Sequence, residues 1–282
     1  MIYEKFEGNS ASVCIENIDS NDPYIKIGAK AFLSCKNVYE IKLPDTIDEI
    51  GAWAFAHMKE LKKIIVPARK MSIGKDAFLD CDSLKEVAVY PDNSNNSGLS
   101  FLLASCITVL KANDLLDFEM ASEQGEAWYE LYDRELINYI HQSDDRGFQP
   151  VIVGWFNDEG EEEQLSRYVK KVRADKINLS FLRLKYDSYI ENSTKESLLE
   201  YLRTQINQSD SSDNSTWRIL RDVLAEDIQY VKLAVTNELL SDELKSELIR
   251  YLNNKNASTE IVAYLVQSIR GNDSNIDAQF EL

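Results

Sequence analysis

The segment IGAWAFAHMKELKKIIVP, residues 50–67, decides the fold of this chain because close variants of it recur on either side. The three copies lie 23 residues apart, with their glycines at Gly28, Gly51 and Gly74. They share the pattern Ile-Gly-x-x-Ala-Phe-x-x-(Cys/Met)-x-x-Leu-x-x-Ile-x-Val-Pro, in which the third copy shifts its proline by one residue to Pro91. One such unit is too short to bury its own apolar face, so in-register copies predict stacked coils that bury it between them.

Each copy combines a strand pattern with a turn pattern. Apolar residues alternate at 41–43, 64–66 and 87–89, which predicts one short strand per copy with one buried face. The Ala-Phe pair predicts a tight helical turn on the opposite side, and the glycine predicts a corner with positive φ. We therefore expect a buried column of Phe32, Phe55 and Phe78.

This pattern resembles the BspA-type leucine-rich repeat of bacterial proteins, with its consensus I-G-x-x-A-F-x-x-C-x-x-L-x-x-I-x-I-P. The resemblance covers residues 24–93, preceded by a degenerate cap with Val13, Ile15 and Ile18. It implies a short leucine-rich-repeat solenoid and a role in protein binding. After it, residues 99–102 and 107–110 predict a hairpin of two strands that caps the open end.

Beyond Lys111 the apolar period changes to that of a helix. The pattern predicts helices over residues 128–140, 148–156, 158–186, 193–202, 217–224, 228–235, 241–252 and 258–270. Ser193, Ser241 and Ser258 are the expected N-caps, Gly271 is the expected C′ residue, and 207–215 is a polar linker. Pairs of short helices here resemble ankyrin-like or other helical hairpins.

The predicted fold class is therefore α+β, a 23-residue-repeat solenoid followed by an all-α helical-hairpin region. We expect a repeat domain with its caps over residues 1–111, a helical domain over 112–208, and C-terminal helical hairpins over 209–282.

Charge and hydropathy exclude several classes of protein. The net charge is −17, and residues 1–93 carry 15 acidic and 12 basic residues. The remainder holds 33 acidic and 19 basic residues, a net charge of −14, which favours a basic protein surface over nucleic acid as partner. The first seven residues include three charged ones, Glu4, Lys5 and Glu7, where a signal peptide would need an apolar run. The longest uncharged apolar stretch, 99–110, is too short to cross a membrane. We expect a cytoplasmic protein with four free thiols.

No residue pattern of known chemistry stands out. The two histidines, His57 and His141, are far apart in sequence, and Cys35 and Cys81 occupy the same repeat position rather than a zinc-ligand spacing. The acidic run 158–163 lacks the spacing of a calcium loop, and the basic run 167–185 is interleaved with apolar residues as in an amphipathic helix. We predict no catalytic residue, no metal site and no cofactor.

The candidate binding residues are those that strand alternation points outward. They are Glu40, Lys42, Lys63, Ile65, Glu86 and Ala88. The sequence favours a non-enzymatic interaction module or scaffold that binds through this strand face, through the acidic helical region, or through both. Two alternatives stay open: an effector or enzyme with a site in the helical region, and a structural subunit of a bacterial assembly.

Overall fold

The computed structural model of the chain describes residues 2–3, 12–14, 25–91, 98–123, 125–149, 160–208, 215–255 and 258–277. The chain divides into two compact units. We call Met1–Leu136 together with Ser188–Ile190 the repeat unit, and Ile137–Asp187 together with Glu191–Leu282 the helical unit. The domain boundaries predicted after residues 111 and 208 stay a prediction.

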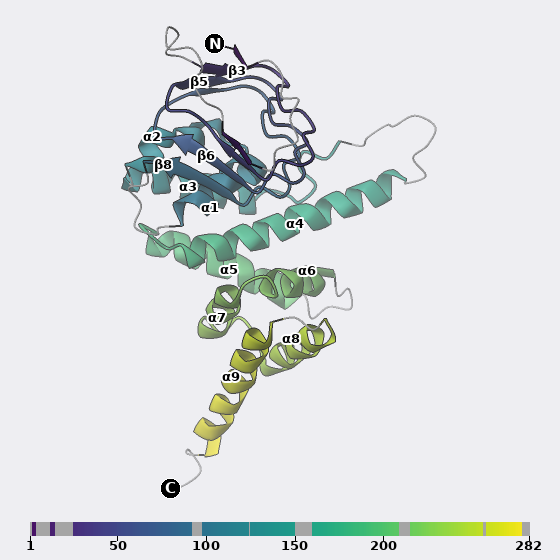
Figure 1. Cartoon of the computed structure of the whole chain (residues 1–282). Helices are drawn as coiled ribbons and strands as arrows, with labels where there is room; N and C mark the ends of the chain where they lie inside the picture. Colours follow the sequence, from purple (N-terminus) through teal and green to yellow (C-terminus); the bar gives the residue numbers. More distant parts are fainter. Residues whose placement is uncertain are drawn as a thin grey trace. The chain divides into compact units, whose positions relative to one another are not determined.

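The repeat unit holds two parallel sheets of four short strands (Figure 1, purple and blue). The first contains β1 (Ile2–Tyr3), β3 (Ile25–Ile27), β5 (Ile47–Ile50) and β7 (Ser72–Ile73). The second contains β2 (Ser12–Cys14), β4 (Glu40–Lys42), β6 (Lys63–Pro67) and β8 (Glu86–Tyr90). Each copy therefore contributes two strands, one to each sheet.

Strand register follows the sequence repeat. Ile41 pairs with Ile64 and Ile64 with Val87, each 23 residues further along the chain. In the other sheet Ile27 pairs with Ile50 and Ile50 with Ile73. The sequence predicted the strand of the second sheet and missed that of the first, because two to four residues give too little alternation to recognise.

Close packing between copies explains the repeat glycines. A Cβ on Gly51 would lie 2.6 Å from the backbone nitrogen of Ala29, and one on Gly74 would lie 2.4 Å from that of Ala52. The positive φ predicted for these glycines is wrong, since the left-handed conformation falls on other residues. In the central copy these are Trp53 and His57, with φ of 62° and 58°.

The predicted phenylalanine column is confirmed. The ring centroids of Phe32 and Phe55 lie 5.1 Å apart, and those of Phe55 and Phe78 lie 5.2 Å apart, in stacked geometry. Phe55 is fully buried, as expected for the centre of the column. The stacked rings form one part of a core that otherwise consists mainly of aliphatic side chains.

The predicted capping hairpin is wrong, because its residues form helices. α1 (Leu99–Ser105) continues into a π-helix, η1 (Cys106–Leu110), and α1 packs on β8. Leu99, Leu102 and Leu103 share the buried helical face. This spacing outweighs the strand preference of the β-branched residues that follow. A 3₁₀ turn, η2 (Asn113–Leu116), and α2 (Phe118–Ser122) complete the cap.

Seven further helices are described after the cap (Figure 1, teal to yellow). They are α3 (Glu126–Ile140), α4 (Glu161–Lys185), α5 (Asn192–Gln208), α6 (Ser215–Leu224), α7 (Ile228–Thr236), α8 (Asp242–Asn254) and α9 (Thr259–Asp277). In the helical unit α4 packs against α5, α6 and α7, and α8 packs against α9.

The predicted helix ends are partly right. Ser241 and Ser258 accept hydrogen bonds from Leu244 N (3.3 Å) and Ile261 N (3.4 Å), as N-caps do. Ser193 instead lies inside α5, where its hydroxyl donates to Glu191 Oε2 at 3.0 Å.

The predicted end of the last helix at Gly271 is wrong. Gly271 does not end α9, which continues to Asp277, since a helix tolerates an interior glycine at a cost of about 1 kcal/mol. Most of the helix predicted over 148–156, and residues 209–214 of the predicted linker, lie outside the described residues.

Candidate protein-binding surface on the repeat unit

The outer face of β4, β6 and β8 carries all six residues predicted to point outward. We call this surface the strand face. Its two rows, aligned by register, are Glu40–Lys63–Glu86 and Lys42–Ile65–Ala88. The residues between the rows, Ile41, Ile64 and Val87, are completely buried. The alternation therefore places the six side chains together on one accessible face, as the sequence predicted.

The first row alternates in charge across the sheet. Lys63 Nζ lies 2.7 Å from Glu86 Oε1, and each of these side chains is 32% exposed. Glu40 pairs with Lys63 in register on the other side. Because opposite charges alternate along the row, their fields largely cancel, and the row presents directional polar groups rather than a single-sign patch.

The second row, Lys42–Ile65–Ala88, is more apolar, and Tyr90 contacts it from β8. Lys42 Nζ lies 5.1 Å from the centre of the Tyr90 ring. The Tyr90 hydroxyl donates a hydrogen bond of 2.6 Å to the carbonyl of Leu43, so this side chain links β8 to the end of β4. Ile65 lies in the middle of the row, half-buried between Lys42 and Ala88.

A shallow hollow of about 620 Å³ lies at the N-terminal ends of these strands. Two aromatic side chains line it, Tyr39 with 45% and Phe101 with 37% of their surface exposed. The hollow is also lined by Glu40, Lys62, Lys63, Asp82, Ser83, Lys85 and Glu86. Lys62 Nζ lies 5.6 Å from the centre of the Tyr39 ring, in cation–π geometry. Exposed aromatic residues next to mixed charges are typical of protein interfaces.

The sequence analysis missed both aromatic residues of this hollow. Tyr39 falls at a variable position of the repeat, occupied by Lys62 and Lys85 in the next copies, and such variation is itself a sign of exposure. Phe101 lies 23 residues after Phe78, at the phenylalanine position of a fourth copy. In α1 this side chain points out of the column instead of into it.

The cysteines have the surroundings of structural thiols. Cys35, Cys81 and Cys106 are free, as predicted, while the side chain of Cys14 lies outside the described residues. Burial raises the pKa of the Cys81 thiol to about 11, and its Sγ donates to the Phe55 carbonyl at 3.0 Å. A thiol of this pKa stays protonated at neutral pH and is a poor nucleophile or metal ligand.

The histidines lie in different surroundings. His57 Nδ1 is 3.1 Å from Asp80 Oδ2, at the same position of the next copy. His141 lines a hollow of about 480 Å³ with residues of α5, among them Glu196, Glu200 and Tyr201. Within the described part of the chain, no three His, Cys, Asp or Glu residues lie close enough together to hold a metal ion.

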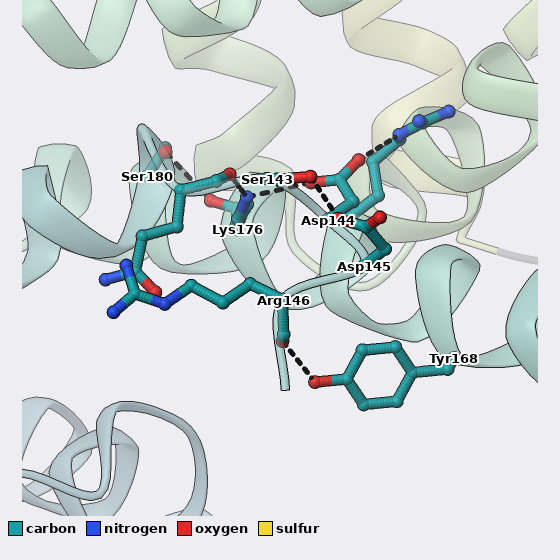
Figure 2. A network of polar contacts seen from close by, with 9 residues as sticks. Ser143, Asp144, Asp145, Arg146, Tyr168, Lys176 and Ser180 are labelled. Carbon is teal, nitrogen blue, oxygen red and sulfur yellow. Dashed lines mark hydrogen bonds and ion pairs between the residues drawn. The ribbon is translucent and has the colours of Figure 1, made fainter. Parts of the chain in front are cut away.

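A network of polar contacts in the helical unit surrounds a buried lysine (Figure 2). Lys176 is only 1% exposed, and its Nζ donates to Asp144 Oδ1 at 2.8 Å and to the carbonyl of Gln142. Arg173 joins the same carboxylate to α6, with Nε 3.0 Å from Asp144 Oδ2 and an Nη donating to Thr216 Oγ1 at 2.9 Å. Lys176 is thus paired and buried, and it links α4 to the turn after α3.

A second contact fixes the same turn from its other end. The Tyr168 hydroxyl on α4 donates to the carbonyl of Arg146 at 2.7 Å (Figure 2). Gly147 follows with φ of +85°, and a Cβ there would lie 3.2 Å from that hydroxyl. The turn therefore depends on glycine both for its backbone conformation and for space.

Two parallel sheets with a 23-residue register over an aromatic column define a repeat protein, and comparison with known families agrees. Residues 8–117 match the family model of the BspA type leucine rich repeat region, in six copies. The first part of the chain is therefore a BspA-type leucine-rich repeat region, and it extends beyond the predicted limits of 24–93 on both sides. No curated protein and no solved structure matches the chain.

Leucine-rich repeats generally mediate protein–protein interaction. The matched residues contain every residue of the strand face and of its hollow. Across the described ranges, no helix combines the length and the apolar character needed to cross a bilayer.

Proposed function

We propose that this chain is a non-enzymatic interaction module that binds another protein through the strand face. The observation that carries the proposal is the hollow, where Tyr39 and Phe101 are exposed beside the charged row of Glu40, Lys63 and Glu86. Aromatic anchors surrounded by polar groups are the usual centres of binding energy in protein interfaces. The repeat class of the region supports the same role.

Support for the structural part of the proposal comes from the repeated register. Each described copy adds one strand to each sheet at the same spacing, which is the behaviour of a short solenoid. A solenoid presents one continuous strand surface, and we propose that this surface is the scaffold for binding. We propose that two helical parts follow this solenoid, as the sequence predicts: a helical domain over residues 112–208 and helical hairpins over residues 209–282.

We propose the helical region as a second surface for a basic partner. Its support is the net charge of −14 carried by the residues after Asn93. Complementary charge raises association rates more than it raises affinity, so this region would steer a partner that the strand face holds. A cytoplasmic location and a bacterial source belong to the same proposal and rest on the sequence.

The proposal that the chain is non-enzymatic has its support in the helical unit. The polar groups that converge there, around Lys176 and Asp144, are paired with one another. Catalysis would need such groups to line an accessible cavity, where a substrate reaches them.

The test is capture of partners from the source cell by the full chain, compared between two matched variants. Ile65→Glu places a charge in the centre of the strand face, whereas Ser72→Glu places the same charge on β7 of the other sheet. Both positions are accessible strand residues, so both variants should fold. We expect a partner that the native chain and Ser72→Glu retain and that Ile65→Glu loses by about tenfold or more.

Photo-crosslinking locates the contact directly. A benzophenone amino acid at Tyr39 should crosslink the same partner, and one at Ser72 should not. The proposal is wrong if Ile65→Glu retains every captured protein at the native level, or if both crosslinking positions give the same products.

A further inference from the structure

Backbone hydrogen bonds link the turn of each copy to the turn of the next. Phe32 N donates to the Ala54 carbonyl at 2.7 Å, and Phe55 N donates to the Ala77 carbonyl at 2.8 Å. Two further bonds per copy flank this one. They run from Lys30 N to Ala52 O, Ser34 N to Ala56 O, Trp53 N to Lys75 O and His57 N to Leu79 O, at 2.7–3.1 Å. Three N–H groups of each copy thus point toward the copy that follows.

The third copy has the same three donors at Asp76, Phe78 and Asp80. Among the described residues, none of these N–H groups has a hydrogen-bond acceptor. The sequence that would supply the next acceptors begins at Gly98, but there the chain turns into α1 and uses its carbonyls within the helix. Unpaired backbone donors at the end of a ladder are a template for another strand or extended segment.

A hollow of about 310 Å³ lies beside these donors, and we call it the end hollow. Its walls combine residues 73–79 of the last copy with residues of the cap, namely Cys106, Ile107, Lys111 and Leu116. Phe78 retains 8% exposure, whereas Phe32 and Phe55 are completely buried. The column of rings therefore ends beside this hollow, where Phe78 is slightly more exposed than the two rings before it.

We propose that the end hollow binds a short peptide segment of a partner protein, which adopts the turn conformation of residues 52–57 and so continues the stack. The segment would carry two carbonyl groups two residues apart, accepting from Asp76 N and Phe78 N. The residue after the second carbonyl would be aromatic and would stack on Phe78. In the central copy these roles belong to Ala52, Ala54 and Phe55.

The packing of the existing copies defines the residue types that fit. In the central copy Gly51 lies directly before Ala52, and a side chain at Gly51 would meet the backbone of the previous copy. The ligand therefore needs a glycine directly before its first hydrogen-bonding residue. Ala54 and Phe55 are both completely buried, so a small residue must precede the aromatic one. The expected ligand pattern is Gly-small-x-small-aromatic. A volume of about 310 Å³ is at the lower end of ligand sites, ~300–1,000 Å³, and suits one aromatic residue with its neighbours.

The probe is a synthetic peptide with the sequence of residues 47–59, because this segment already stacks on an equivalent turn within the chain. The matched control peptide carries Phe55→Ala. Amide hydrogen exchange of the full chain is measured with each peptide at saturating and substoichiometric concentrations. We expect the native peptide to slow exchange at Asp76, Phe78 and Asp80, and the control to bind roughly tenfold more weakly or worse.

Two protein variants separate this site from the strand face. Ile107→Trp fills the end hollow from the cap side and should abolish protection by the peptide, whereas Ile65→Glu should leave protection unchanged. Exchange in β4 and β6, which belong to the same unit as Ile107, reports whether Ile107→Trp stays folded. If Ile107→Trp does not fold, the comparison of the two peptides on the native chain still tests the proposal. No protection of the three amides at saturating peptide, or equal protection by both peptides, overturns the proposal and leaves the strand face unaffected.

Discussion

The repeat unit and the helical unit place their charges in opposite ways. In the three copies of the repeat unit, residues 25–91, the buried residues are apolar, and ion pairs join neighbouring copies at the surface, as between Lys26 and Glu49 or Lys59 and Asp82. In the helical unit Lys176 and Arg183 are buried, and Lys176 is held by the carboxylate of Asp144. Burying a charge costs free energy that its partners must offset, so the second unit depends on particular polar contacts where the first depends on apolar stacking.

This difference predicts different responses to mutation. A repeat unit loses stability when a side chain of the column or a close backbone contact changes, and loses little when a surface charge is removed. The helical unit should respond strongly to the loss of one charged residue, because its partner is then left unpaired in the interior.

The largest effect is expected in the column. Phe55→Ala removes a completely buried ring between two others and should lower the free energy of unfolding by about 3–5 kcal/mol. The loss for Phe78→Ala should be about 1 kcal/mol smaller than the loss for Phe55→Ala, because the end hollow already leaves part of the Phe78 ring without neighbours. Urea unfolding of both variants measures the difference. Equal losses would show that the hollow is filled in solution.

A comparable loss should follow from removing one carboxylate of the helical unit. Asp144→Ala leaves the buried Lys176 without its counter-ion and should cost about 2–4 kcal/mol, somewhat less than for a fully buried pair because Asp144 is 23% exposed. Adding Lys176→Met should restore part of that loss, since the buried charge is then gone. Thermal unfolding of the single and double variants tests this. A double variant less stable than Asp144→Ala would contradict the account.

The two units also differ in how far the sequence predicts them. In the repeat unit a buried position recurs at a fixed interval, so Ile41, Ile64 and Val87 identify one another and the outward residues between them. In the helical unit the lysine at 176 looks like any basic residue on an amphipathic helix. Its partner Asp144 lies 32 residues away, and no periodicity connects the two.

Prediction also failed where the period ends. Residues 98–110 keep Phe101 at the repeat interval but fold as helices, because the leucines of α1 match helical spacing and no further copy covers them. One of the two exposed aromatic residues of the hollow, Phe101, therefore comes from a segment that the sequence analysis assigned to a strand hairpin. Local sequence preference and the stacking partner compete at such an end, and only the structure shows which prevails.

An intermediate effect is expected from the close approach of neighbouring copies. Gly51→Ala places a methyl group 2.6 Å from a backbone nitrogen that side-chain motion does not relieve, and should cost about 1–3 kcal/mol. The control is Gly125→Ala, where nothing lies within 4 Å of the added carbon. That variant should be neutral or slightly stabilising. If both substitutions behave alike in chemical unfolding, the tight stacking of the copies is not what limits this position.

The smallest effect is expected for the ion pairs between copies. Lys59 Nζ lies 2.7 Å from Asp82 Oδ2, with both side chains more than half exposed. A double-mutant cycle with Lys59→Ala and Asp82→Ala should give a coupling of about 0.2–1 kcal/mol, as for other exposed pairs. The coupling should shrink further in 1 M salt, where the screening length falls to about 3 Å.

The pH dependence of this pair has a definite sign. The hydrogen bond to Asp82 raises the pKa of Lys59 above its ordinary value of 10.5. The folded chain therefore holds the lysine proton more tightly than the unfolded chain. The contribution of the Lys59–Asp82 pair to stability is thus complete just below pH 10.5 and is lost as the pH rises through the raised pKa.

At neutral pH salt should weaken the Lys59–Asp82 coupling, while the loss caused by Asp144→Ala should change little, because a buried pair is screened less. A Lys59–Asp82 coupling above about 2 kcal/mol that persists in salt would reverse the comparison. Surface charge, rather than the apolar column, would then hold the copies in register.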